Sequence, residues 1–204
     1  GADVLIAQGI EAGGHRAQFD QSAAPQPVTT AALVERLAAS ASALIVGAGG
    51  VDGPGAAQEL LDRGAVAVQL GTLFLTTDEA GTKPTHRAAL LRAAQADAAG
   101  ETVLTRVFTG RPARALTNRF TQEMEAAAVV GYPQVHFLTA SIRAAAASSH
   151  DRELLNLWSG TGVAGCRQEP AASLVARFTQ LERLAPGPPT GRMHLAGPHE
   201  GSTR

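Results

Sequence analysis

Residues 8–16 read QGIEAGGHR and directly follow the short apolar run VLIA at residues 4–7. The apolar run predicts a buried strand over about residues 3–7, bounded by glycine. Glycines after a strand let the backbone turn sharply and let a ligand lie close against it. In parallel α/β proteins, ligand sites lie at the carboxyl ends of strands, which is where residues 8–16 fall. A tight strand-to-helix turn with solvated charges would leave the same pattern, so this stretch alone leaves both interpretations equally open.

Two more strands with glycine-containing ends follow along the chain. The apolar run at residues 43–46 predicts a second strand that ends in Gly47-Ala48-Gly49-Gly50. Residues 65–70 predict a third strand, which ends at Gly71-Thr72. Strands joined by helices through short links predict a parallel sheet with right-handed crossovers. Because the strands are continuously apolar, we expect both faces of the sheet to be covered.

The two connecting helices carry start and stop signals. Thr29 or Thr30 can cap the first helix, which we expect to run to about Ala38. Asp52 or Gly53 can cap the second, with Pro54 in its first turn, where a missing N–H costs little. Gly64 is expected to stop this helix in the left-handed conformation.

The glycine loops after the second and third strands should be neighbours, because these strands lie one βα unit apart. Backbone N–H groups in such loops bind phosphate, and in (β/α)8 barrels the phosphate site commonly follows the last two strands. We therefore interpret the three strands as the sixth, seventh and eighth strands of a TIM barrel. Residues 47–52 do not form a dinucleotide fingerprint, since Asp52 stands where the third glycine is needed. Turn geometry alone is the weaker alternative for Gly49-Gly50.

Composition limits the class of protein. The chain has 204 residues, of which 45% are hydrophobic and 17% charged, as in a globular domain. A formal net charge of −1 gives no electrostatic case for binding nucleic acid or an anionic membrane. The single cysteine, Cys166, predicts a small buried apolar residue and suits a reducing, cytoplasmic location. No apolar run is long enough to span a bilayer, and the start at Gly1, directly before a strand, indicates a chain that begins in mid-domain.

The remainder of the chain is predicted to be mainly helical. We expect three parts: a barrel portion at residues 1–100, a helical segment at 101–185 that packs on it, and a flexible tail at 186–204. Trp158 is expected to anchor the core or a lid rather than to form a ligand platform. Arginines 111, 114 and 119 are expected to be structural. Helices are expected from Thr85 to near Gly100 and over residues 122–130, 138–148 and 171–184, with an extended segment at 101–108.

Several stretches together resemble one enzyme family. Residues 8–16 resemble the QGxEAGGHR segment of the nitronate monooxygenases, the FMN enzymes formerly called 2-nitropropane dioxygenases. Matching stretches follow in the same order, and the resemblance covers roughly residues 1–185. These stretches are VGAGGVDG at 46–53, VQLGT at 68–72, FTGRPAR at 108–114 with NRF at 118–120, and LWSG at 157–160.

The resemblance implies a cofactor and a reaction. Family members bind FMN non-covalently at the carboxyl face of a barrel and oxidise alkyl nitronates with O2 to a carbonyl compound and nitrite. No metal site is implied. Gln8 and Gly13 would contact the flavin. The residues that would hold it, largely through its phosphate, are Gly49, Gly50, Gln69, Leu70, Gly71 and Thr72.

His15 matches the family's active-site histidine. It would take the α-proton when a neutral nitroalkane is the substrate, and otherwise help to place the nitronate. A histidine near its reference pKa of about 6.5 is mostly a neutral base at pH 7. An ordinary surface histidine is the alternative, and Glu11 is given no catalytic role, since it could orient its neighbours or be solvated.

Departures from the family pattern keep other functions open. Ala17 stands where the family usually has glycine, and Thr161 replaces a glutamine. Strands one to five of the barrel would lie outside this chain, so we expect weak FMN binding and poor turnover by the chain alone. The alternatives are a flavin reductase that reduces quinones or enoyl thioesters with NAD(P)H, a barrel with another phosphate ligand, and an inactive half-barrel. The chain is also expected to form a homo-oligomer or to depend on the missing half.

Overall fold

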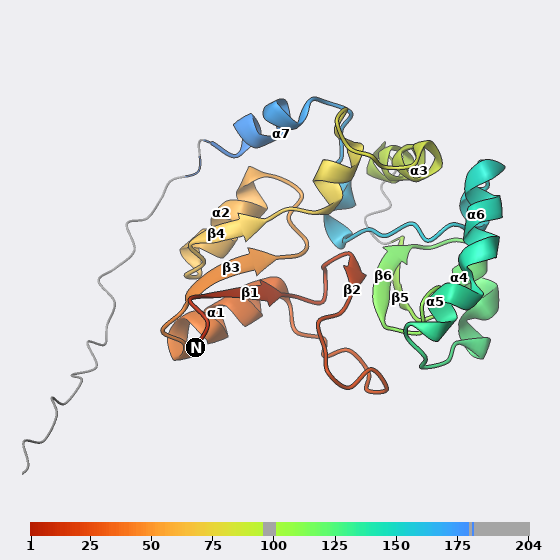
Figure 1. Cartoon of the computed structure of the whole chain (residues 1–204). Helices are drawn as coiled ribbons and strands as arrows, with labels where there is room; N and C mark the ends of the chain where they lie inside the picture. The colour runs from red at the N-terminus through yellow and green to blue at the C-terminus, as the bar shows by residue number, and fades with distance from the viewer. Residues whose placement is uncertain (96–100, 180, 182–204) are drawn as a thin grey trace, which may run out of the picture.

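A three-stranded parallel sheet forms the first part of the computed structural model (Figure 1). The strands β1 (Val4–Gln8), β3 (Leu44–Ala48) and β4 (Ala67–Gln69) lie side by side in that order. Helix α1 (Thr30–Ser40) joins β1 to β3, and α2 (Pro54–Asp62) joins β3 to β4. The expected strand–helix–strand–helix–strand unit is confirmed. The structure describes residues 1–95, 101–179 and 181.

The signals expected to start and stop these helices act as predicted. The Thr29 hydroxyl accepts a hydrogen bond from the Ala32 N–H (3.2 Å) at the start of α1. Gly53 precedes α2, and Pro54 is its first residue. Gly64 follows α2 with φ of 105°, the left-handed conformation that glycine adopts without strain.

The parallel sheet is covered on one face only by the described residues. Ala7 and Ile45 pack on Val34 of α1 and on Ala57 of α2, and all four side chains are buried. On the opposite face Val4, Ile6 and Leu44 are 47%, 58% and 54% exposed, respectively. The expectation that both faces are covered is therefore wrong for this chain, because no described element packs on the second face.

A second sheet is antiparallel and mostly unexpected. Strand β6 (Ala113–Leu116) pairs with both β2 (Gly14–His15) and β5 (Thr102–Thr105). The extended segment expected at residues 101–108 is confirmed only in its first half, by β5, because residues 107–109 form a turn. β2 and β6 were not expected, since Gly14-His15 is too short to show a pattern and ARAL at 113–116 favours a helix. Tertiary contacts override that preference, because Ala113 and Ala115 are fully buried.

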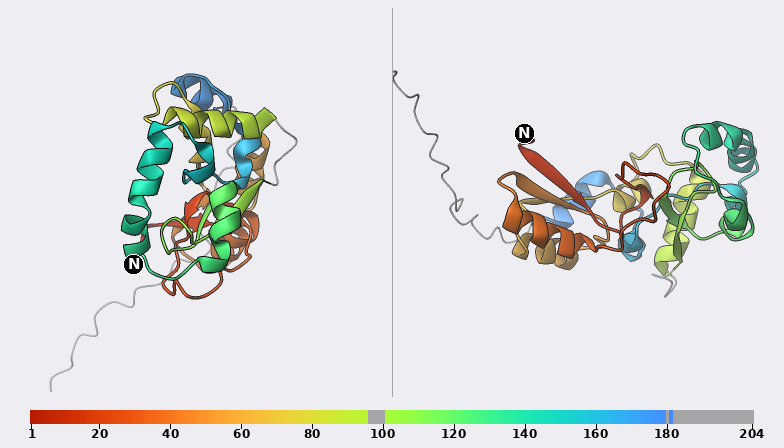
Figure 2. Two further views of the ribbon diagram at one scale, coloured as in Figure 1. Left: turned by 90° about the vertical axis from the view of Figure 1, so that its right-hand side faces the viewer. Right: turned by 90° about the horizontal axis from the view of Figure 1, so that it is seen from below.

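The remaining elements are helices, most of them short, and many of them pack around a second core. That core joins the side chains of Leu73, Leu90, Leu116, Leu157 and Leu174. Figure 2 shows the parallel sheet at one end of an elongated molecule and α4–α6 at the other. The helices are η1 (Thr72–Thr76), α3 (Pro84–Gln95), α4 (Arg119–Met124), η2 (Glu125–Ala127), α5 (Gln134–Leu138), α6 (Ala140–Ser148), η3 (Arg152–Leu154), η4 (Thr161–Gly165) and α7 (Ala171–Arg177).

Several helix boundaries differ from those expected. Helix α3 begins at Pro84 rather than after a cap at Thr85, since proline fits the first helical position. The helix expected at residues 122–130 begins at Arg119, because Asn118 caps it, and the 138–148 helix begins at Ala140 after the separate α5. The helix expected over residues 171–184 is shorter than predicted, since α7 ends at Arg177. The expected end of α3 near Gly100 and the tail at 186–204 lie outside the described residues.

Candidate active site

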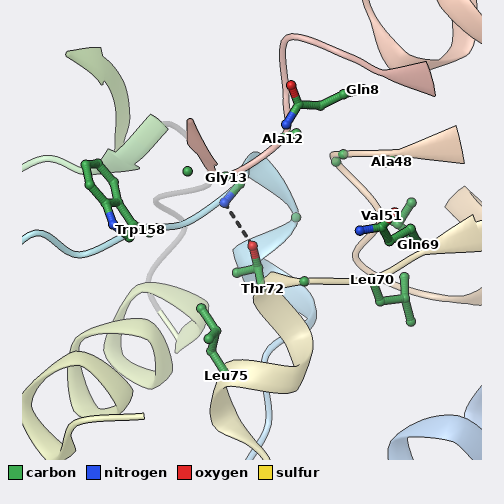
Figure 3. Close-up of a pocket in the computed structure, with 16 residues that line it drawn as sticks. Gln8, Ala12, Gly13, Ala48, Val51, Gln69, Leu70, Thr72, Leu75 and Trp158 are labelled. Atoms are coloured by element: carbon green, nitrogen blue, oxygen red, sulfur yellow. Dashed lines mark hydrogen bonds between the residues drawn. The ribbon is translucent and has the colours of Figure 1, made fainter. Parts of the chain in front are cut away.

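The loops that follow β1, β3 and β4 surround one cavity with a volume of about 250 Å³. The loops after β3 and β4 are neighbours there, as expected. Figure 3 shows Trp158 on one side of the cavity and Gln69 on the other. All of the residues predicted to bind the cofactor line this cavity: Gln8, Gly13, Gly49, Gly50, Gln69, Leu70, Gly71 and Thr72.

Strand register explains why residues so far apart in sequence meet. Gln8 is paired with Ala48, and Ala48 is paired with Gln69, at the carboxyl ends of three parallel strands. Partners in a parallel ladder point to the same face of the sheet, so these three side chains form one row. That row lies at the carboxyl end of the sheet and forms part of the cavity wall.

Several of the lining glycines, Gly13 and Gly49 among them, are required by contacts within the chain. A Cβ atom on Gly13 would lie 2.5 Å from the Gly160 nitrogen. A Cβ on Gly49, whose φ is 119°, would lie 2.7 Å from the Ala12 nitrogen. Gly71 differs, because a Cβ there would meet no described atom within 4 Å and its φ of −118° suits any residue. Gly71 therefore leaves open space beside the cavity that the fold itself does not require.

Two polar side chains of the wall hold the surrounding loops together. The Thr72 hydroxyl accepts a hydrogen bond from the Gly160 N–H (2.9 Å), drawn as the dashed line in Figure 3. The Gln8 amide donates to the His15 carbonyl (3.1 Å) and accepts from the Ala17 N–H (2.9 Å). Thr72 and Gln8 each keep one hydrogen for which the described residues provide no acceptor, so each can still donate to a ligand.

The loop at residues 8–16 is built around a buried arginine. Arg16 is 6% exposed, and its guanidinium donates to the carbonyls of Gln8, Gly9 and Ala12. The Glu11 carboxylate accepts from the Thr30 N–H (2.9 Å) and hydroxyl (3.1 Å), which ties the loop to α1. The interpretation of residues 8–16 as a turn with solvated charges is thus wrong, whereas the orienting role considered for Glu11 is confirmed.

His15 lies beside the cavity rather than in its wall. Its Nε2 is 2.8 Å from the Thr109 Oγ1, and its ring centroid is 5.6 Å from that of Trp158, which does line the cavity. The Tyr132 ring also packs against His15, with its centroid 5.3 Å from that of the imidazole. Burial, and then the positive charge of Arg111, lower the pKa of His15, so the imidazole is neutral at pH 7.

Sequence reasoning missed part of this neighbourhood. Trp158 packs edge-on against the buried Phe108 (5.7 Å), as a core anchor would, but it also lines the cavity. Thr109 belongs to the matched FTGRPAR stretch, which was the available signal for it. Tyr132 carried no signal, because only the folded chain brings it to His15.

The arginines expected to be structural include two that bind backbone carbonyls. Arg111 donates to the Arg16 carbonyl (2.9 Å), and Arg114 donates to the Ile10 carbonyl (3.0 Å).

Cys166 is buried as expected, and burial raises the pKa of its thiol to about 11, so the thiol is unreactive at neutral pH.

The model of the nitronate monooxygenase family matches residues 1–180. The chain belongs to the nitronate monooxygenase family. This agrees with the geometry, since four of the stretches that carry the resemblance, at 8–16, 46–53, 68–72 and 157–160, each contribute residues to one cavity. Within the described residues, no helix is long and apolar enough to cross a membrane, and no group of three or more potential metal ligands occurs.

Individual relatives support the same family. A nitronate monooxygenase of Pseudomonas aeruginosa is 39% identical over 184 residues, covering 88% of this chain and 51% of the relative. A probable nitronate monooxygenase of Staphylococcus aureus is 37% identical over 182 residues, covering 87% and 50%. The chain therefore spans about half the length of the curated relatives that it matches.

Solved structures show the same partial coverage. A nitroalkane oxidase from Streptomyces ansochromogenes superposes with a TM-score of 0.78 at 38% identity, covering 88% of this chain and 51% of that one. FabK from Thermotoga maritima superposes with a TM-score of 0.70 at 25% identity, covering 87% of this chain and 53% of FabK.

Proposed function

We propose that this chain is the part of a nitronate monooxygenase that holds the phosphate end of FMN and carries the histidine base. The enzyme oxidises alkyl nitronates with O2 to a carbonyl compound and nitrite. The observation that carries this proposal is the convergence of every predicted cofactor-binding residue on a single cavity. The bound flavin supplies the redox chemistry, and the protein positions and tunes it.

The residues present fit a phosphate group. Gly71 leaves open space at the cavity wall, where an anion can approach the backbone without meeting a side chain. The Thr72 hydroxyl, beside it, can donate to a phosphate oxygen while it accepts from Gly160. Gly49 and Gly50 offer further backbone N–H groups from the loop after β3.

The volume of the cavity supports a site that encloses part of the cofactor rather than all of it. Pockets for ligands of this size usually enclose about 300–1,000 Å³, whereas this cavity encloses about 250 Å³. The uncovered face of the sheet and the match to half of each relative agree with strands six to eight of a barrel whose other strands complete the bed. We therefore infer weak FMN binding by the chain alone.

His15 supplies acid–base chemistry beside the flavin. As a neutral imidazole it can accept the α-proton of a nitroalkane, and as an imidazolium it attracts an anionic nitronate. It lies against Trp158, which lines the cavity, so a substrate bound in the cavity beside Trp158 would lie close to His15.

Titration of FMN into the purified chain, followed by flavin fluorescence, tests the cofactor site. We expect binding to the unmodified chain and a clear loss in Gly71→Val, because the new side chain projects into open space at the cavity. Gly81→Val is the matched control, since a Cβ at Gly81 also meets nothing within 4 Å but Gly81 does not line the cavity. Equal FMN affinity in all three proteins would refute the assignment.

Nitrite release from an alkyl nitronate in the presence of O2 tests the reaction. His15→Asn, loaded with FMN, should bind the flavin but lose turnover of neutral nitroalkanes by about 100-fold or more, the usual contribution of a general base. Oxidation of NAD(P)H under anaerobic conditions, without nitrite, would instead favour the flavin reductase.

A further inference from the structure

The hydroxyl of a buried threonine, Thr109, forms a hydrogen bond with one ring nitrogen of His15. Thr109 is 2% exposed, and its Oγ1 lies 2.8 Å from the His15 Nε2. Its backbone is fixed by a tight turn, in which the N–H groups of Thr109 and Gly110 both donate to the Arg106 carbonyl (3.2 and 2.8 Å). His15 is fixed independently by strand β2, where it pairs with Ala113. Two rigid segments therefore set the contact between the two side chains.

The hydrogen bonds of the Thr109 hydroxyl determine which ring nitrogen of neutral His15 carries the hydrogen. A hydroxyl has one hydrogen to donate and two lone pairs. The hydroxyl lies 3.3 Å from the Arg111 carbonyl, which can only accept, and 3.4 Å from the Arg111 N–H, which can only donate. If the hydroxyl donates to that carbonyl, its second lone pair accepts an N–H from Nε2, and every group is satisfied. If it donated to Nε2 instead, the Arg111 carbonyl would lose this partner.

We propose that Thr109 is a positioning residue that keeps the hydrogen of neutral His15 on Nε2, so that Nδ1 is the atom that accepts the substrate proton. This inference rests on the proposed function of His15 as a base. The Nδ1 atom of His15 has no hydrogen-bond partner among the described residues. It is also not buried, so a substrate can reach it.

In the proposed arrangement, the hydrogen bond between His15 and Thr109 does not change when the proton is transferred. The substrate C–H bond breaks, its electron pair stays on the carbon to form the nitronate, and the proton moves to Nδ1. The ring then carries N–H on both nitrogens, and Nε2–H is already donating to Thr109. The imidazolium is therefore stabilised by a hydrogen bond that exists before the reaction.

The other charged or titratable groups facing His15 in the described part of the chain keep it neutral at rest. Arg111 and His136 both lower the pKa of His15, and burial lowers it most. The His136 Nδ1 lies 3.2 Å from the Arg143 guanidinium. Tyr132 contacts the His15 ring through its aromatic edge.

Nitrogen-15 NMR of histidine-labelled protein tests the inference without any need for activity. We expect the His15 signals, assigned by their loss in His15→Asn, to show the Nε2–H form in the unmodified chain. Thr109→Val, which keeps the shape but removes the acceptor, should give mixed tautomers and a lower pKa of His15. Thr109→Ser should restore both properties. An Nδ1–H form in the unmodified chain, or no change in Thr109→Val, would overturn the proposal.

Turnover of the FMN-loaded protein separates positioning from the proposed function itself. Thr109→Val should lower kcat for a neutral nitroalkane, which needs a base, more than for the corresponding nitronate, which does not. Thr109→Ser should recover it. If the tautomer follows Thr109 as expected but neither substrate reacts, even when the chain is joined to the half of the Pseudomonas aeruginosa relative that it does not match, the positioning role stands and the proposed function fails.

Discussion

At the scale of single residues, Gly13 shows that a glycine in a ligand-binding motif can be required by packing. Its missing Cβ would lie 2.5 Å from the Gly160 nitrogen and 2.6 Å from the Ser159 carbonyl carbon, both of them backbone atoms that cannot swing away. We expect Gly13→Ala to lower the free energy of unfolding by about 1–3 kcal/mol, the usual cost of overpacking.

Urea unfolding measures this effect, and Gly81→Ala is the control. Gly81 is exposed, and a Cβ there meets nothing within 4 Å, so its substitution should change the free energy of unfolding by less than about 0.5 kcal/mol. Equal stability of the two variants would show that the loops around Gly13 shift freely, contrary to the packing argument.

The sequence predicted the cavity residues but not the surroundings of the histidine. Most of the predicted cofactor-binding residues lie at the ends of the parallel strands, so their place is fixed by local chain geometry that the sequence reveals, whereas Trp158 reaches the cavity from elsewhere in the chain. Tyr132 and Thr109 reach His15 only through the second sheet and the turns around it, and no local pattern encodes such contacts. The order of the motifs identified the family, but it did not show what His15 is bonded to.

At the scale of elements, Asn118 decides where helix α4 begins. Its Oδ1 accepts from the Thr121 N–H (3.1 Å), and its Nδ2 donates to the carbonyls of Arg152 (2.9 Å) and Leu155 (2.8 Å). Asn118→Ala removes the cap and takes away the side-chain donor to the Arg152 carbonyl and to the buried Leu155 carbonyl. We expect it to lower the free energy of unfolding by about 2–4 kcal/mol, the sum of a cap and a lost buried donor.

Thr29→Ala at α1 is the comparison that isolates the buried part of this effect. Thr29 also caps a helix, but its described side-chain hydrogen bond is a single, exposed one to the Ala32 N–H. Loss of this hydrogen bond should lower the free energy of unfolding by only about 1 kcal/mol. If urea unfolding gave the same loss for both variants, the two donations by Asn118 would contribute nothing to stability.

The elements that the sequence predicted are those with locally encoded boundaries. The parallel strands are apolar runs between glycines, and α1 and α2 carry their own caps. The second sheet lacks such signals, since β6 is fixed by its partners β2 and β5 rather than by the propensity of residues 113–116. The sequence therefore located the cavity and gave only one strand of the sheet that holds His15.

At the scale of the whole molecule, one face of the parallel sheet needs a partner that the described residues do not provide. Register places Val4 beside Leu44, and Ile6 beside Val46, on this face. Exposed apolar side chains on a parallel sheet are unusual, because such sheets are normally covered on both faces. The same face ends at the row of Gln8, Ala48 and Gln69 in the cavity wall. Whatever covers the apolar face therefore also borders the cavity.

Joining this chain to the half of the Pseudomonas aeruginosa relative that it does not match tests the connection between the face and the cavity. We expect the fusion to bind FMN at least about tenfold more tightly than the chain alone, because each 1.4 kcal/mol of added contact gives a factor of ten. Ile6→Lys provides the control. In the isolated chain, where Ile6 is 58% exposed, it should be tolerated, whereas in the fusion it would place an unpaired charge inside the protein. A fusion that binds FMN no better than the chain, and that accepts Ile6→Lys without loss of stability, would show that the face is not the interior of a barrel.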